Sequence, residues 1–176
     1  LELDDTTSFA LLRIGKCHEK LGNNDLAIRH YSKTVHEDPL LDKGLIAITD
    51  FYIRKRDYQK ALYYTNKAIN IDGENVLYWK RYARINNKLE FFEEAERGYQ
   101  KAIELGNYEL ETWLSRADIL RYLGEIDAAM QNLYQAIEFY PENPEIHFRL
   151  AGMYYEKQDY KNGELQLRKG MELDQE

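Results

Sequence analysis

A period of about 34 residues runs through almost the whole chain. Three places in each period carry a small residue, and the register of these places never slips. The fifteen residues are Gly15, Thr49, Ala83, Ala117 and Ala151, then Ala27, Ala61, Ala95, Ala129 and Gly163, then Thr34, Ala68, Ala102, Ala136 and Gly170. Two helices approach closely only where no bulky side chain separates their backbones. The pattern therefore predicts a repeated unit of closely packed helices.

Larger side chains recur around the small ones at helical spacing. The residues four places before the first small position are Leu11, Leu45, Trp79, Trp113 and His147. Such i, i+4 spacing is typical of the buried stripe of an amphipathic helix. A short turn-like cluster precedes the second small position of each unit, as in Gly22-Asn23-Asn24-Asp25. With only 10 Gly and 3 Pro in the chain, the sequence predicts paired antiparallel helices joined by short turns.

These residues resemble the tetratricopeptide repeat, whose unit is a helix-turn-helix with the same period. The resemblance implies an all-α, right-handed superhelical solenoid. It places five units in one domain, at residues 8–41, 42–75, 76–109, 110–143 and 144–176, with residues 1–7 as the tail of a preceding repeat. Pro39 and Pro141 fall where the family usually ends its second helix. Arg116 replaces an expected large apolar residue, which predicts softer packing there.

No catalytic or metal-binding motif stands out, so we expect no enzyme activity, no metal and no cofactor. The sequence contains no HExxH motif and no serine in a glycine elbow, and Cys17 is its single cysteine. His18 and His147 fall at packing positions of the repeat, so structural roles are expected for both. An expectation of no nucleotide binding follows from the absence of any Gly-rich loop after a predicted strand.

No apolar run approaches the roughly 20 residues that a membrane span needs, so we expect no membrane insertion. The sequence does not fix a compartment, although its ordinary soluble composition slightly favours the cytoplasm. The first residue is not Met, which suggests that the parent protein begins further upstream.

In the resembling family, the first helix of each unit lines a concave groove. Carried over by position, the groove holds 11 Lys or Arg and 6 Asp or Glu, although the whole chain has a net charge of −7. Most of the basic residues belong to the first three units, and aromatic residues join them in the last two. The candidate binding residues are Arg13, Lys16, Lys20, Lys43, Arg54, Lys80, Arg81, Arg84, Lys88, Arg121, Tyr122, Phe148, Arg149 and Tyr155.

The leading interpretation is an adaptor that binds a protein or peptide, with acidic side chains on units one to three and an apolar side chain at the aromatic end. Alternatively, the cations are solvated or pair with Glu19 and Asp50 of the same chain. A second function is self-assembly into homo-oligomers through the repeat ends. A third is binding of RNA or single-stranded nucleic acid, which the overall acidity disfavours.

One subclass of the family grips the terminal carboxylate of chaperones with a lysine, two asparagines, a lysine and an arginine. The best matching window here offers Lys80, Arg84, Ser115, Glu145 and Arg149. Only two of the five residue types match, and the Glu145 carboxylate would repel the ligand. We therefore do not expect binding of that type.

Overall fold

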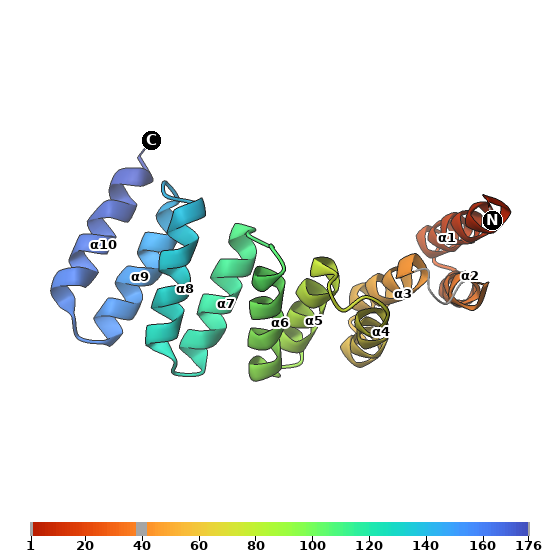
Figure 1. Cartoon of the computed structure of the whole chain (residues 1–176), viewed down its shortest axis with the longest axis horizontal. Coiled ribbons are helices and arrows are strands. Elements are labelled where there is room, and N and C mark those ends of the chain that lie inside the picture. Colours follow the sequence, from red (N-terminus) through yellow and green to blue (C-terminus); the bar gives the residue numbers. More distant parts are fainter. Residues whose placement is uncertain (1, 38–41, 176) are drawn as a thin grey trace. The chain divides into compact units, whose positions relative to one another are not determined.

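The computed structural model describes residues 2–37 and 42–175, which form ten α-helices and no β-strand (Figure 1). Apart from the connection between α2 and α3, which lies outside the described residues, the helices follow one another through short turns. Their bounds are α1 Glu2–Lys20, α2 Asn24–Glu37, α3 Asp42–Arg54, α4 Tyr58–Ile71, α5 Val76–Lys88, α6 Phe92–Glu104, α7 Leu110–Tyr122, α8 Ile126–Phe139, α9 Pro144–Glu156 and α10 Tyr160–Leu173. The all-helical prediction is therefore confirmed over the part of the chain that the structure describes.

The helices fall into two compact units. The first, Leu1–Phe91, contains α1 to α5 and is called the N-terminal module below. The second, Phe92–Glu176, contains α6 to α10 and is called the C-terminal module. Consecutive helices pack against each other as α1 with α2, α3 with α4, α7 with α8, and α9 with α10. The boundary between the modules falls inside the third predicted repeat.

Polar side chains and left-handed residues set the helix ends. Asp57 and Asp159 accept a backbone N–H at the first turns of α4 and α10, and Asn75 and Asn143 do the same for α5 and α9. One residue with a positive φ follows each first helix, always at the same place of the repeat. These residues are Gly22, Arg56, Glu90, Gly124 and Gln158, with φ between 59° and 82°. The left-handed turn recurs even where glycine does not.

All fifteen small positions of the sequence pattern are buried. In the N-terminal module a Cβ atom on Gly15 would lie 2.5 Å from the Tyr31 ring, and in the C-terminal module one on Gly170 would lie 2.6 Å from the Phe148 ring. The close approach predicted from the repeat is therefore confirmed. Larger side chains such as Ile48 and Leu133 fill the cores on either side of these contacts.

One interpretation of the sequence differs from the structure. Residues 2–7 belong to the same continuous helix as residues 8–20, whereas a tail of a preceding repeat would need a turn between residues 7 and 8. At Arg116 the unit contains a polar network in place of the expected large apolar side chain. The Arg116 guanidinium donates to Glu96 at 2.8 Å and to Asn132 at 3.2 Å, so its charge and polar hydrogens have partners. Pro39 lies outside the described residues.

Candidate functional site

Ion pairs join successive first helices within each module. In the N-terminal module, Arg54 of α3 donates to Glu19 of α1 at 2.6 and 2.8 Å. One helix further on, Arg81 of α5 donates to both oxygens of Asp50 on α3, at 2.9 and 3.1 Å. These contacts place α1, α3 and α5 side by side. The surface that they share is called the first-helix face of the N-terminal module below.

The C-terminal module repeats this arrangement between α7 and α9. Arg149 donates to both oxygens of Asp118 at 3.0 and 3.2 Å, and Arg149 also pairs with Glu145 on its own helix. Arg121 donates to Glu156 at 2.6 Å. Four predicted binding cations, Arg54, Arg81, Arg121 and Arg149, are therefore paired within the chain. The partners of Arg54 and Arg81 are Glu19 and Asp50, the two carboxylates that the alternative interpretation of the sequence named.

Glu19 connects the α1–α3 pair to the core, because the Tyr31 hydroxyl also donates to its carboxylate at 2.9 Å. Burial opposes the ionisation of Glu19, but the hydrogen bonds from Arg54 and Tyr31 outweigh it and hold the pKa of Glu19 below its ordinary value. Burial, together with the hydrogen bond to Glu19, raises the pKa of Tyr31. This corner of the first-helix face is a fixed, charged network.

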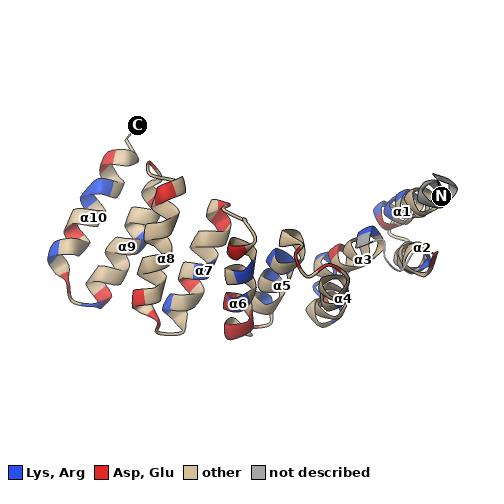
Figure 2. Ribbon diagram, in the orientation of Figure 1, with Lys and Arg blue, Asp and Glu red and all other residues tan. Residues whose placement is uncertain are grey.

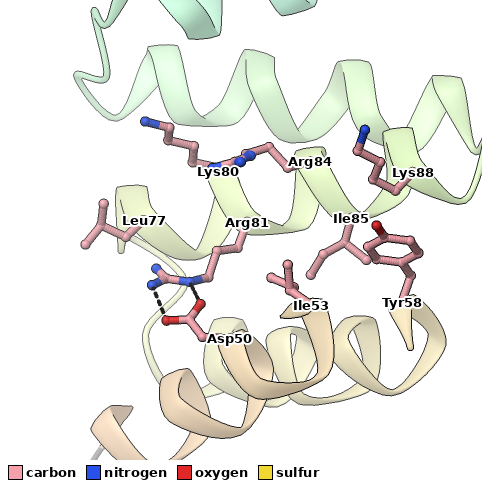
Figure 3. Close-up of a pocket in the computed structure, with 9 residues that line it drawn as sticks. All are labelled: Asp50, Ile53, Tyr58, Leu77, Lys80, Arg81, Arg84, Ile85 and Lys88. Carbon is pink, nitrogen blue, oxygen red and sulfur yellow. Dashed lines mark hydrogen bonds and ion pairs between the residues drawn. The ribbon is translucent and has the colours of Figure 1, made fainter. Parts of the chain in front are cut away.

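A cleft of about 320 Å³ opens between α3 and α5 on the first-helix face (Figure 3). Its apolar end is formed by Ile53, Tyr58 and Ile85, and Ile85 is almost fully buried. Leu77 stands at the other end with 51% of its surface exposed. The remaining lining is charged and consists of Asp50, Lys80, Arg81, Arg84 and Lys88. The cleft therefore combines an apolar end with a cationic wall.

The cationic wall belongs to α5, whose sequence contains four Lys or Arg and no Asp or Glu (Figure 2). Arg81 is engaged by Asp50, and Lys80 stands beside Arg84 in the close-up (Figure 3). Arg84 and Lys88 are exposed and form no ion pair within residues 2–37 and 42–175. Two positive charges are thus available to a ligand at one wall of the cleft.

The other candidate cations of the N-terminal module lie outside this cleft. Lys16, Lys20 and Lys43 are exposed on α1 and α3. The Arg13 guanidinium lies 5.5 Å from the centre of the Phe9 ring, a cation–π contact between neighbours on α1. The structure therefore gathers Lys80, Arg81, Arg84 and Lys88 at one cleft, and the candidates of α1 do not contribute to it.

The aromatic candidates belong to the C-terminal module and contact its own residues. Phe148 and Tyr155 lie against the small positions Gly170 and Gly163 of α10, so both contribute to helix packing. Tyr122 is 70% exposed, and its ring centre lies 4.2 Å from that of Phe92.

A second cavity of about 380 Å³ lies in the C-terminal module beside Tyr122. Its other lining residues are Asp118, Arg121 and Glu156. Two carboxylates line this cavity, and its single cation is already paired with Glu156. The charges of this cavity therefore attract an acidic ligand less than those of the α3–α5 cleft do.

Sequence reasoning missed two residues of the cleft. Neither Tyr58 nor Ile85 was among the candidate binding residues, yet both line the apolar end of the cleft. Ile85 carries no signal that could have identified it, because a buried isoleucine on a first helix is also what core packing requires. Ile53 and Leu77 occupy positions that line the groove in the resembling family.

Two further properties of the described residues bear on function. None of the helices described here combines the length and the hydrophobicity that a transmembrane span requires. Within the same residues, no three His, Cys, Asp or Glu side chains gather as metal ligands would.

Known sequences show the same repeat. The family described as "Tetratricopeptide repeat" matches residues 9–40, and the one described as "TPR repeat" matches residues 117–158. A TPR repeat-containing protein of Methanocaldococcus jannaschii is 26% identical over 165 residues, which cover 84% of this chain and 29% of that protein. The general transcriptional corepressor trfA of Dictyostelium discoideum is 22% identical over 102 residues, or 58% of this chain and 7% of that protein. The chain thus spans less than a third of the length of either relative.

Solved structures share the fold at low sequence identity. A crystal structure of MamA protein has a TM-score of 0.84 and 20% identity, covering 96% of this chain and 92% of that one. A structure described as "YrrB: a TPR protein with an unusual peptide-binding site" has a TM-score of 0.77 and 19% identity, covering 93% and 84%. These matches lead to one conclusion: residues 9–40 and 117–158 are tetratricopeptide repeats, and the chain shares the fold of the solved structures.

Proposed function

We propose that this chain is a protein-interaction scaffold that binds an acidic protein segment on the first-helix face of its N-terminal module. The observation that carries the proposal is the α3–α5 cleft, where an apolar end lies beside the free cations Arg84 and Lys88. Apolar pockets with a few directed polar groups are typical ligand sites. The similar protein YrrB is itself described as having a peptide-binding site.

The test is site-specific photocrosslinking with the full chain in an extract of its source cells. A photoreactive phenylalanine replaces Leu77 at the cleft in one variant and Tyr63 in the other. Tyr63 is a matched control because it is similarly exposed, on α4 of the same module. We expect one polypeptide to be captured from Leu77 alone, with excess unmodified chain competing for it. Capture from Tyr63 to the same extent, or no capture from Leu77, would show that the cleft is not the binding surface.

A second candidate function is self-association, and one comparison along the repeat favours it. Leu167 of α10 is 36% exposed, whereas Tyr31, Thr65, Tyr99 and Leu133, its equivalents in the four preceding second helices, are at most 3% exposed. Inside the chain, Tyr31 packs edge-to-face against Phe51 of the next first helix at 6.4 Å. The equivalent of Phe51 on α1 is the exposed Cys17, so a second copy offers the complementary face.

This candidate predicts a contact between Leu167 of one copy and Cys17 of another. A short bismaleimide should link Leu167→Cys chains into dimers, and Cys17→Ser in the same chain should abolish the link. Sedimentation of the unmodified chain should show a mass that rises with concentration. A constant monomer mass together with no cross-linking would rule out this candidate and would leave the proposed ligand site unaffected.

A further inference from the structure

The α3–α5 cleft measures about 320 Å³ and is walled by helices of one folded module. Its apolar end is formed by three side chains, Ile53, Tyr58 and Ile85. A segment in extended conformation can place a single side chain there, because successive side chains of such a segment point to opposite sides. We take the occupant of the cleft to be such an extended segment.

The free cations of α5 set the spacing of the carboxylates in that segment. Arg84 and Lys88 are four residues apart on one helix, so they are separated by about 6 Å along its axis. In an extended chain, side chains two residues apart point the same way and lie about 6.6 Å apart. Two carboxylates at alternate residues can therefore reach Arg84 and Lys88 together, whereas adjacent carboxylates point to opposite sides.

The residue between the two carboxylates points away from the cationic wall. The apolar end of the cleft lies on that side, with Ile53 on α3, Tyr58 at the start of α4 and Ile85 on the inner side of α5 (Figure 3). An aliphatic side chain there removes apolar surface from water, which favours binding. A polar side chain would lose its hydration without gaining a partner among these three residues.

Asp50 lies on α3, across the cleft from α5, and its pair with Arg81 of α5 contributes little net charge. Both carboxylate oxygens of Asp50 accept hydrogen bonds from Arg81, so the two charges largely cancel (Figure 3). Among the described residues, Asp50 is the only carboxylate in the cleft lining, and a ligand carboxylate placed beside it would be repelled. Recognition of acidic groups is thus confined to the Arg84 and Lys88 side.

We propose that the α3–α5 cleft recognises an extended protein segment of the pattern acidic–aliphatic–acidic, with both carboxylates on Arg84 and Lys88 and the aliphatic side chain between Ile53, Tyr58 and Ile85. This proposal rests on the proposed function, because it specifies the ligand of the same site. Its two requirements, alternate carboxylates and a central aliphatic group, distinguish it from attraction by charge alone.

The test compares acetylated and amidated peptides of one composition by chemical-shift titration of the full chain. The probe is Gly-Ser-Glu-Leu-Glu-Ser-Gly, and its isomer Gly-Ser-Leu-Glu-Glu-Ser-Gly places the two carboxylates on adjacent residues. We expect the probe to bind about tenfold more tightly than the isomer, with shifts confined to the cleft residues. A third peptide with Ser in place of the central Leu should also bind about tenfold more weakly, because it buries no aliphatic group.

Variants of the chain assign the contacts. Arg84→Gln with Lys88→Gln should weaken the probe about tenfold, since both charge-assisted hydrogen bonds are lost. The matched control, Arg29→Gln with Lys33→Gln, removes the same charge at the same spacing from exposed positions of α2 and should leave the affinity unchanged. Both double variants should keep the helical spectrum of the unmodified chain, because all four side chains are exposed.

Three outcomes would overturn the proposal. Equal affinity for the probe and its isomer would refute the alternate spacing. If both double variants weakened the affinity for the probe equally, the interaction would depend only on the net charge of the chain. Equal binding of a short thymidine oligonucleotide would show that any polyanion is accepted, as the nucleic-acid interpretation predicts. If capture from Leu77 succeeds while these peptide tests fail, the scaffold function stands and only the ligand chemistry is wrong.

Discussion

Arg81 and Asp50 form a two-point ion pair that ties α5 to α3 at the edge of the cleft. The same pair recurs two repeats later as Arg149 and Asp118 in the C-terminal module. The equivalence provides a matched control for the role of Asp50, because one pair lies beside a cleft with free cations and the other does not.

Asp50→Asn should strengthen the binding of the Glu-Leu-Glu probe about threefold, because it removes the one carboxylate of the cleft and frees Arg81. Asp118→Asn should leave that affinity unchanged. Both substitutions should cost about 1 kcal/mol or less of unfolding free energy, since the pairs are partly exposed. Titration of the two variants, alongside urea unfolding, measures both effects. Identical affinities in the two variants would contradict a role of Asp50 in the cleft.

The left-handed turns predict stabilising substitutions. Arg56, Glu90 and Gln158 have φ values of 59°, 62° and 61°, at positions where Gly22 and Gly124 serve two other repeats. A residue other than glycine in the left-handed region costs about 1–2 kcal/mol of folding free energy, and a change to glycine removes this cost. Glycine also has more conformational entropy in the unfolded chain, which offsets about 0.4–1 kcal/mol of that gain. Each change to Gly should therefore stabilise the chain by about 0.5 kcal/mol in urea unfolding. Gly124→Ala should destabilise it, and a loss of stability in all three Gly variants would refute the strain.

The close packing at the small positions predicts opposite effects for two glycine substitutions. Gly15→Ala places a methyl group 2.5 Å from the Tyr31 ring and should cost about 1–3 kcal/mol through overpacking. Gly152→Ala, within α9, meets no atom within 4 Å and should stabilise the chain by about 0.5–1 kcal/mol because alanine favours helix. Thermal unfolding of the two variants checks the prediction. If the Gly15→Ala variant unfolded at a higher temperature than the unmodified chain, α1 and α2 would have to move apart at little cost in free energy.

The pKa of Glu19 predicts a loss of stability in acid. Because the folded pKa lies below the ordinary 4.5, the carboxylate contributes stability that is fully present above about pH 4.5 and is lost as the pH falls through the folded pKa. Glu19→Gln should therefore be less stable than the unmodified chain at pH 7, and the difference should shrink as the pH drops below 4.5. Urea unfolding at neutral pH and at two acidic pH values measures this. A difference independent of pH would show that packing alone is affected.

Arg116 and Glu96 should be strongly coupled. Both side chains are largely buried, and Arg116 also donates to Asn132, whose amide donates to the Trp113 carbonyl at 2.8 Å. Glu96→Ala leaves the Arg116 charge without its carboxylate and should cost about 3 kcal/mol. Replacing both residues by Leu removes the stranded charge and should cost less than Glu96→Ala alone. A double-mutant cycle in urea would contradict the coupling if the single effects simply added.

Much of the fold could be predicted from the sequence because its signals are local and repeated. The small residues at Gly15 and Gly170 require close helix contacts wherever they stand, and the structure confirms both. For the charges, the sequence named Glu19 and Asp50 as alternative partners, but it could not decide which cations are paired. Whether Arg81 is paired depends on a carboxylate 31 residues away, and for Arg54 the partner is 35 residues away. Such pairing depends on the stagger between neighbouring helices, which no local pattern encodes.

The apolar end of the cleft was equally difficult to predict. Ile85 is nearly fully buried, so its pattern in the sequence is that of any core residue. Its second role, facing a cavity, arises only because Ile53 and Tyr58 leave space beside it. The cations at Arg84 and Lys88 were identified from the sequence, and their binding role stays a prediction.

The ion pairs between first helices also give the repeats a fixed order. Glu19 meets Arg54 at one junction, whereas at the same places of another junction Arg121 meets Glu156 with the charges exchanged. If the first and fourth repeats were exchanged, Arg121 would face Arg54 and Glu19 would face Glu156. The repeats share one backbone shape, but the charges at their junctions differ. An array with the first and fourth repeats exchanged would therefore place like charges opposite each other at two junctions.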